Sequence, residues 1–119
     1  MSAYKSRPIW KRGMLFAHAV YAALEAAGSR STGAGVRLRK AAVSVPSLIG
    51  EAFLDSTGRG DEALRLAVSR LSEVERLLSG EAGLAGIAEG DRRALLAEVD
   101  GLKGEIEVLR LGRGSTVAQ

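Results

Sequence analysis

The chain has 119 residues, a formal net charge of +3 and 46% hydrophobic residues, which is enough for one domain with its own core. It contains no cysteine, so disulfides and thiolate metal sites are excluded and we expect a reducing, cytoplasmic setting. Only 4% of the residues are aromatic, while Ala, Leu, Glu and Arg abound, and this composition favours an all-α fold.

The first predicted helix begins after Ser6, which we expect to cap it, and Pro8 suits its first turn. Its apolar residues recur at helical spacing and predict one buried face, formed by Trp10, Met14, Ala17, Tyr21 and Leu24. The apolar run 14–24 follows two basic residues, as in a secretory signal, but it is too short and too polar to span a bilayer. We therefore expect neither a cleaved signal nor a membrane anchor. The glycine-rich residues 28–35 form a connection.

The second predicted helix, residues 36–54, contains Pro46 in its middle. A proline there removes one backbone hydrogen bond and costs about 3 kcal/mol. The apolar stripe nevertheless continues through the proline: Leu38, Ala42, Val45, Ile49 and Ala52. We therefore expect one helix that is kinked at Pro46, with the hydroxyl groups of Ser44 and Ser47 near the bend.

Two more amphipathic helices follow the loop 55–60. The third covers residues 61–79, and the fourth begins at the capping residue Asp91 and ends at Gly112. Their buried positions are predicted as Leu64, Ala67, Leu71, Val74 and Leu78, and as Leu95, Val99, Leu102, Ile106 and Leu109. Within the fourth helix, Gly101 and Gly104 indicate either a close helix contact or a soft helix end.

Helices of about 20 residues joined by short loops favour antiparallel neighbours. We predict an antiparallel up-and-down four-helix bundle over residues 1–112, followed by a flexible tail, residues 113–119.

The run LRKAAVSVPSLIGEAF, residues 38–53, closely resembles the signature RRAAVSIPSNIAEGF of the four-helix-bundle proteins encoded in intervening sequences of bacterial 23S ribosomal RNA genes. The matching residues are Ala41, Ala42, Val43, Ser44, Pro46, Ser47, Ile49, Glu51 and Phe53. The segments YKSRPIWKR and AVSRLSEVE also fall in register with that family. The chain departs from the pattern at Leu48, where the family has Asn, and at Ser69 and Arg70, where it has Gly and Ser.

The resemblance implies more than a fold. Family members are similar to the accessory variability determinant of diversity-generating retroelements, a basic homopentameric bundle that partners a reverse transcriptase and nucleic acid. By that likeness the chain is a homopentamer, and Ser44, Pro46, Ser47 and Glu51 form its structural motif.

Positive charge is concentrated in the first half of the chain. Residues 1–59 carry nine Lys or Arg and three Asp or Glu, whereas residues 60–119 carry eight and eleven. Basic residues gather at the starts of the first and second helices, where they oppose the helix macrodipole, so a partner of opposite charge is expected. The candidate nucleic-acid-binding residues are Lys11, Arg12, Arg37, Arg39 and Lys40. The alternative partner is the acidic second half of a neighbouring subunit, through Asp61, Glu62, Glu73 and Glu75.

Little in the sequence favours an enzyme. With one histidine, no cysteine and no phosphate-binding glycine motif, we expect no catalytic residue, metal or cofactor. We expect His18 to be a packed or surface residue rather than a catalytic base. We expect Glu51 to form a structural ion pair with a basic residue of a neighbouring helix rather than to act as a general base.

The helices carry more apolar residues than a monomer is expected to bury. The surplus residues are Leu15, Phe16, Val20, Ala23, Leu48 and Phe53, and they favour burial between subunits. The sequence thus predicts a homo-oligomer, pentameric by resemblance, that binds RNA or DNA through phosphates, with little base specificity because aromatic residues are few. The alternative is an adaptor that binds a protein partner. We expect no membrane association.

Overall fold

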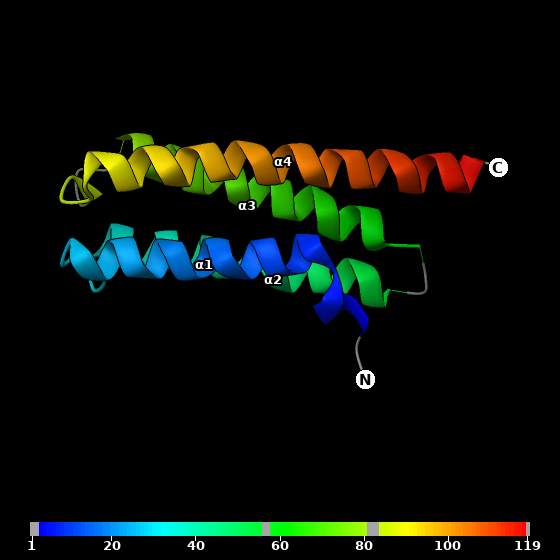
Figure 1. Cartoon of the computed structure of the whole chain (residues 1–119), viewed down its shortest axis with the longest axis horizontal. Helices are drawn as coiled ribbons and strands as arrows, with labels where there is room; N and C mark the ends of the chain where they lie inside the picture. Colours follow the sequence, from blue (N-terminus) through cyan, green and yellow to red (C-terminus); the bar gives the residue numbers. More distant parts are fainter. Residues whose placement is uncertain (1–2, 56–57, 81–83, 119) are drawn as a thin grey trace.

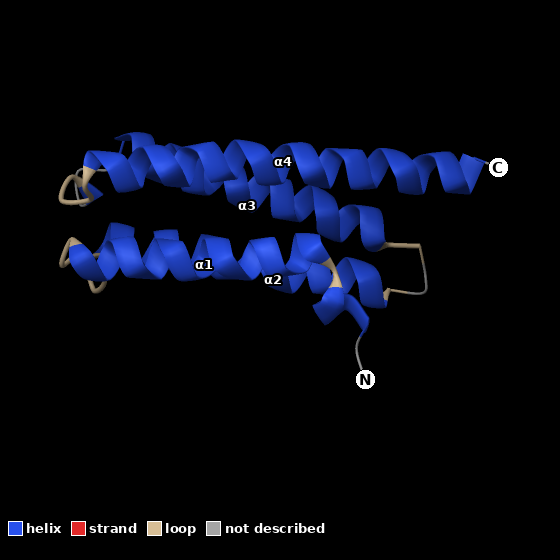
Figure 2. Ribbon diagram, viewed as in Figure 1, coloured by secondary structure: helices blue, strands red, loops and turns tan. Residues whose placement is uncertain are grey.

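The computed structural model describes residues 3–55, 58–80 and 84–118, with side chains up to residue 112. In this part of the chain the regular structure is helical and contains no strand, as Figure 2 shows. The helices are η1 (a 3₁₀-helix, Ala3–Ser6), α1 (Pro8–Ala26), α2 (Gly33–Leu54), α3 (Gly60–Gly80) and α4 (Glu89–Ala118). The predicted all-α class and its four α-helices are confirmed for the described residues.

α1 begins at Pro8 as predicted, but Ser6 does not cap it. The hydroxyl of Ser6 donates to the carbonyl of Ala3 at 2.7 Å within η1. Arg7 occupies the N-cap position and makes no side-chain capping hydrogen bond. The missing N–H of Pro8 explains why the helix starts there without a cap, since one donor fewer needs a partner.

α2 begins at Gly33, earlier than predicted, because Thr32 caps it. The Thr32 Oγ1 accepts a hydrogen bond from the Gly35 N–H at 2.9 Å and donates to the Ser29 carbonyl at 2.9 Å. A Cβ atom at Gly35 would collide with that same carbonyl, so the glycine belongs to the cap rather than to a loop. From there α2 runs through Pro46 to Leu54 without a break.

α3 matches its predicted bounds closely, whereas α4 differs from them at both ends. α3 agrees within one residue at each end. α4 begins at Glu89, so Asp91 lies in its first turn rather than at its cap, and it continues past Gly112 to Ala118. The predicted end at Gly112 is therefore wrong, because a single exposed glycine weakens a helix by about 1 kcal/mol without terminating it. The predicted flexible tail, residues 113–119, has its side chains and its last residue outside the described part of the chain.

The four long helices lie side by side along one axis. In Figure 1 the sequence colours run in opposite directions along successive helices, and α4 projects beyond the others at its C-terminal end. α2 packs against α1 and α3, and α4 contacts α1 and α3. At 30 residues α4 accounts for most of the 49 Å length of the molecule.

The core is a single cluster of apolar side chains between the helices. The predicted stripes of α2 and α3 are fully buried, and those of α4 are buried except for Leu109, which packs against the core from its edge. Leu84 and Ile87, from the connection before α4, also belong to this core. Helical periodicity was thus sufficient wherever one face is apolar and the other is charged.

In α1 the predicted buried face is correct at Leu24, which is fully buried, and wrong over the rest of the helix. Phe16 and Val20 are 1% and 0% exposed, whereas Tyr21 is 38% exposed and Trp10 and Met14 are half-buried. Both stripes of α1 are apolar at helical spacing, so periodicity alone does not identify the buried one. The packing of α1 against α2 and α4 determines which stripe is buried.

Most of the apolar residues predicted to lie between subunits are buried or partly buried within the protomer. Of the residues assigned to subunit contacts, Phe16, Val20 and Ala23 are buried in the core of the protomer itself. Leu48 and Phe53 are partly buried against that core, and Leu15 alone is largely exposed, at 69%. The exposed apolar residues instead include Val108 and Leu111 on α4, at 71% and 70%.

Candidate nucleic-acid interface

The five predicted nucleic-acid-binding residues lie in two places. Lys11 and Arg12 are near the start of α1, at the end of the molecule where α2 finishes, as Figure 1 shows. Consistent with this, Gly13 lies against Pro46 and Ile49 in the second half of α2. Arg37, Arg39 and Lys40 lie near the start of α2, at the opposite end. The protomer therefore does not bring all five into one patch.

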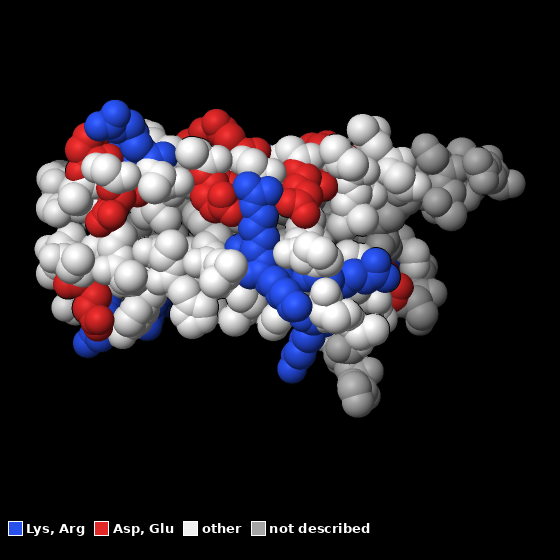
Figure 3. All heavy atoms as spheres, viewed as in Figure 1, with Lys and Arg blue, Asp and Glu red and all other residues white. Residues whose placement is uncertain are grey.

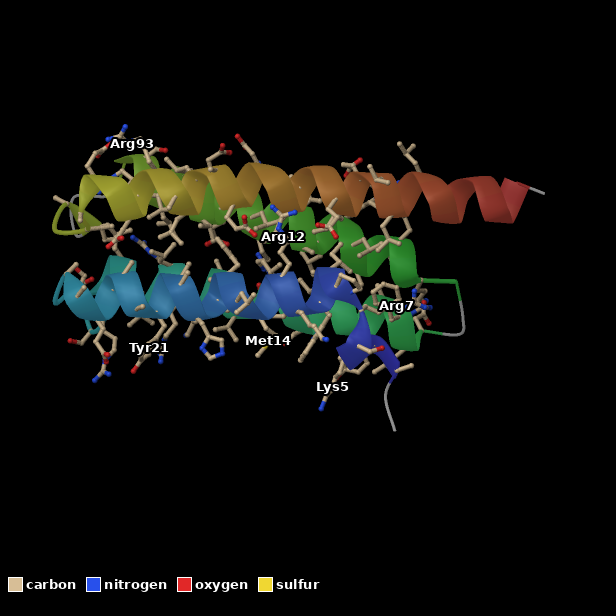
Figure 4. The ribbon with its side chains drawn as sticks, in the orientation of Figure 1. Lys5, Arg7, Arg12, Met14, Tyr21 and Arg93 are labelled. Carbon is tan, nitrogen blue, oxygen red and sulfur yellow. The ribbon has the colours of Figure 1, made fainter. Side chains whose placement is uncertain are left out.

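Arg12 is engaged by two carboxylates of α4. Its Nε and Nη2 donate to the carboxylate of Glu98 at 2.6 and 3.0 Å, and its Nη1 donates to Glu105 at 2.7 Å. Figure 4 shows this side chain reaching from α1 towards α4. The hydrogen bonds to Glu98, and then the one to Glu105, raise the pKa of Arg12 above its ordinary value. Arg12 thus joins two helices, and three of its five N–H donors are engaged by carboxylates that a phosphate would have to displace or share.

Gly101 makes the Arg12 contact feasible. Glu98 and Glu105 lie on the same face of α4, on either side of Gly101, and a Cβ atom at Gly101 would collide with the guanidinium of Arg12. Of the two explanations that the sequence left open, Gly101 fits close packing, although against a side chain rather than a helix backbone. Gly104 has no atom within 4 Å of the corresponding position.

The basic residues of α2 gather with a cation from α3. Arg37, Lys40 and Ser44 line a hollow of about 370 Å³ together with Arg70 and Glu73 of α3. Arg39 and Lys40 line an adjacent hollow of about 400 Å³ on the other side of Ser44. We call this surface the basic face, formed by Arg37, Arg39, Lys40 and Arg70.

Sequence reasoning missed Arg70. The basic residues of α2 are close in sequence, but Arg70 reaches them only because α3 packs along α2. The available signal was the departure from the family pattern, since Arg70 lies at a position where that pattern has a small residue. Its guanidinium also lies 3.6 Å from the carboxylate of Glu73, the one acidic group in the hollow.

The other basic residues near the start of α1 differ in their surroundings. Lys11 is exposed. The guanidinium of Arg7 lies over the Phe53 ring, 4.8 Å from its centroid, which is a cation–π contact.

Most of the acidic residues proposed as subunit contacts are engaged within the chain. Arg110 of α4 bonds Asp61 at 2.8 Å, which raises the pKa of Arg110, and Lys103 bonds Glu75 at 3.1 Å. On the face seen in Figure 3, the acidic side chains gather mainly over α4. These pairs hold α4 against α3, so they offer less charge to a second subunit than the sequence suggested.

The motif residues around Pro46 have separate environments. The Ser44 hydroxyl donates to the Ala41 carbonyl at 2.6 Å, one residue before the carbonyl of Ala42, whose donor Pro46 removes. Pro46 is buried against α1, and Ser47 is exposed. Glu51 is also exposed, and no ion pair to it is found among the described residues, so the expected structural pair is not present there.

His18 is exposed on α1, which agrees with a surface histidine. No three His, Cys, Asp or Glu side chains come together as a possible metal site in the described part of the chain. None of the described helices combines the length and apolar character needed to cross a membrane.

Comparisons of the chain with protein families, with curated proteins and with solved structures found no match.

Proposed function

We propose that this chain is a non-enzymatic, homo-oligomeric helical bundle that binds nucleic acid, specifically RNA, through the basic face. The observation that carries the proposal is the convergence of Arg37, Arg39 and Lys40 of α2 with Arg70 of α3 around two hollows. Lys and Arg side chains spaced along a surface neutralise phosphates and release counterions, which supplies most of the affinity of such binding. Lys11 adds an exposed cation near the other end.

The proposal includes a specific architecture: an antiparallel up-and-down bundle with α2 bent at Pro46, of the kind found in the ribosomal intervening-sequence family that the motif resembles. The pairing of early α1 with late α2, and of Arg110 with Asp61, supports the helix directions. The bend is supported by the missing N–H of Pro46. Residual dipolar couplings along α2 test it, and a straight helix would contradict it.

Oligomerisation, as a pentamer, is the second part of the proposal. One protomer offers only a small basic face, and a ring of copies repeats it into a continuous positive surface. The exposed Val108 and Leu111, near the C-terminal end of the described side chains of α4, support contact between copies. We further propose a cytoplasmic location, which the absence of cysteine supports.

Salt dependence tests the nucleic-acid part. Binding of a structured RNA should weaken steeply as salt rises, and the variant Arg37→Gln/Arg39→Gln/Lys40→Gln should bind more weakly. Because each lost phosphate contact lowers the slope of log K against log salt by about 0.7 to 0.9, the slope should fall by about 2 or more. The measurement is fluorescence anisotropy with a labelled RNA at several salt concentrations.

A matched control separates position from total charge. The variant Arg65→Gln/Arg76→Gln/Arg93→Gln removes three exposed cations from α3 and α4, so both variants change the formal net charge from +3 to 0. We expect the control to bind nearly as the parent does. Equal losses in the two variants, or an affinity that ignores salt, would contradict the proposal. A protein partner that stays bound in nuclease-treated lysate, with no RNA affinity, would favour the adaptor instead.

A further inference from the structure

A further hollow lies away from the basic residues of α3, between the outer sides of α1 and α2. It has a volume of about 620 Å³ and is closed at one end by η1. Its lining includes both tyrosines and the single tryptophan of the chain, Tyr4, Trp10 and Tyr21, together with Met14 and Val43. We call it the aromatic groove. Figure 4 shows Met14, Tyr21 and Lys5 all directed to this side, away from α4.

The aromatic rings are held in place yet remain accessible. Tyr4 and Trp10 meet edge to face, with centroids 5.6 Å apart and planes at 80°, so neither ring is stacked flat on the other. The Tyr4 ring lies on Gly50, where a Cβ atom would come within 2.8 Å of it. The Tyr21 hydroxyl accepts a hydrogen bond from Arg30 at 2.7 Å. Both Tyr4 and Trp10 are only partly buried, and Val43 on the opposite wall is 50% exposed.

The charges around the groove are positive. Lys5 belongs to its lining, and Val43 is shared with the neighbouring hollow that Arg39 and Lys40 line. No acidic residue lines either hollow among the described residues. The aromatic groove therefore adjoins, at Val43, the hollow that Arg39 and Lys40 line.

A site that joins stacking surfaces to cations suits a flat apolar ring that carries phosphate. Unpaired nucleotides have this chemistry: bases stack on aromatic side chains while a positive surface follows the backbone. Paired bases in a duplex cannot enter, because they are stacked on one another. The volume is within the usual range for pockets that hold small organic groups.

We infer that the aromatic groove binds unpaired bases of a single-stranded segment, with the adjoining phosphates on Lys5 and on Arg39 and Lys40. This inference rests on the proposed function and names its ligand more closely, as single-stranded rather than duplex RNA. It also replaces the expectation of little base contact, since the fold gathers three of the few aromatic residues in one place.

The single tryptophan supplies a direct test. Titration of the full chain with an unlabelled oligouridylate should quench Trp10 fluorescence saturably, whereas a duplex of the same length or inorganic phosphate should not. The variant Tyr21→Ala should bind the oligouridylate about tenfold more weakly, and Tyr21→Phe should bind as the parent does. Leu15→Ala is the matched control, because Leu15 is exposed on the same helix but outside the groove. Circular dichroism checks that each variant is folded.

The outcomes separate this inference from the proposed function. Salt-dependent RNA binding without quenching, and without an effect of Tyr21→Ala, would overturn the groove assignment and leave the basic face standing. If Tyr21→Ala changes the sedimentation of the protein but not its RNA affinity, the groove is a contact between copies and the inference is wrong. The absence of any RNA binding would overturn both.

Discussion

At the scale of single residues, the contacts of Arg12 differ from those that the sequence led us to expect. In the sequence Arg12 belongs to a basic cluster at a helix start, where a phosphate ligand is a reasonable expectation. In the structure it lies between Glu98 and Glu105, above Gly101, and links α1 to α4. Charge-assisted hydrogen bonds of this kind stabilise a fold by about 1 to 3 kcal/mol, less where water reaches them.

Gly101 and Gly104 of α4 provide a matched pair for testing this role. Gly104→Ala should raise the free energy of unfolding by about 1 kcal/mol, because alanine favours the helix and meets no neighbour. Gly101→Ala gains the same propensity but displaces the guanidinium, so it should be less stable than Gly104→Ala by about 1 to 2 kcal/mol. Urea unfolding measures both values.

The same comparison in an Arg12→Gln background is the control. Without the guanidinium the two alanine variants should be equally stable, since nothing remains to be displaced. If Gly101→Ala stabilises the parent as much as Gly104→Ala does, the ion-pair role of Arg12 is wrong.

At the scale of elements, the helix ends depend on local hydrogen bonds that glycine-rich sequence obscures. α2 starts at Gly33 because Thr32 bonds both Gly35 and Ser29, although the glycines and serines of this stretch predict a loop. α4 passes Gly112 for the opposite reason: glycine lowers helix propensity without stopping a helix that is established on both sides.

Removal of the α2 cap should be measurable. Thr32→Ala loses the acceptor for the Gly35 N–H and should lower the free energy of unfolding by about 1 kcal/mol. Thr32→Ser keeps the hydroxyl and should retain most of the stability. Ser31→Ala, one residue earlier and exposed, should change it by less than about 0.5 kcal/mol. Urea denaturation of the three variants checks the order, and a neutral Thr32→Ala would exclude the cap.

At the scale of the whole molecule, ion pairs hold α4 against its neighbours, while apolar residues near the end of its described side chains stay exposed. Arg12, Lys103 and Arg110 form bonds that fix α4 against α1 and α3. On the same helix, Val108 and Leu111 are exposed at 71% and 70%. An exposed apolar pair one helical turn apart is suited to burial against another copy.

Sedimentation velocity tests the oligomer. At micromolar concentration we expect one species heavier than the 12.5 kDa monomer. Val108→Ser with Leu111→Ser should shift it to a lighter species, because the buried apolar area is lost. Arg93→Ser with Asp100→Ser is the control, since it changes exposed polar residues of the same helix and leaves the net charge unaltered. A monomer at every concentration would remove the ring from the proposal.

The sequence by itself determined the all-α class, the four helices and most of the core. In α2, α3 and α4 an apolar stripe faces a polar one, so periodicity identifies the buried side, and the stripe that continues through Pro46 correctly predicts one helix there. It also located the basic residues of α2, because Arg37, Arg39 and Lys40 are neighbours along the chain.

Only the tertiary structure decided which side of α1 is buried, what Arg12 binds and where the aromatic residues meet. α1 is apolar almost all round, so its own pattern is compatible with either face, and only contact with α2 and α4 selects Phe16 over Tyr21. Arg70 joins the basic face, and Tyr4 joins Trp10 and Tyr21, through the packing of separate helices. The physical reason is the same in each case: a helical repeat specifies directions around one helix, whereas a site requires the relative position of several.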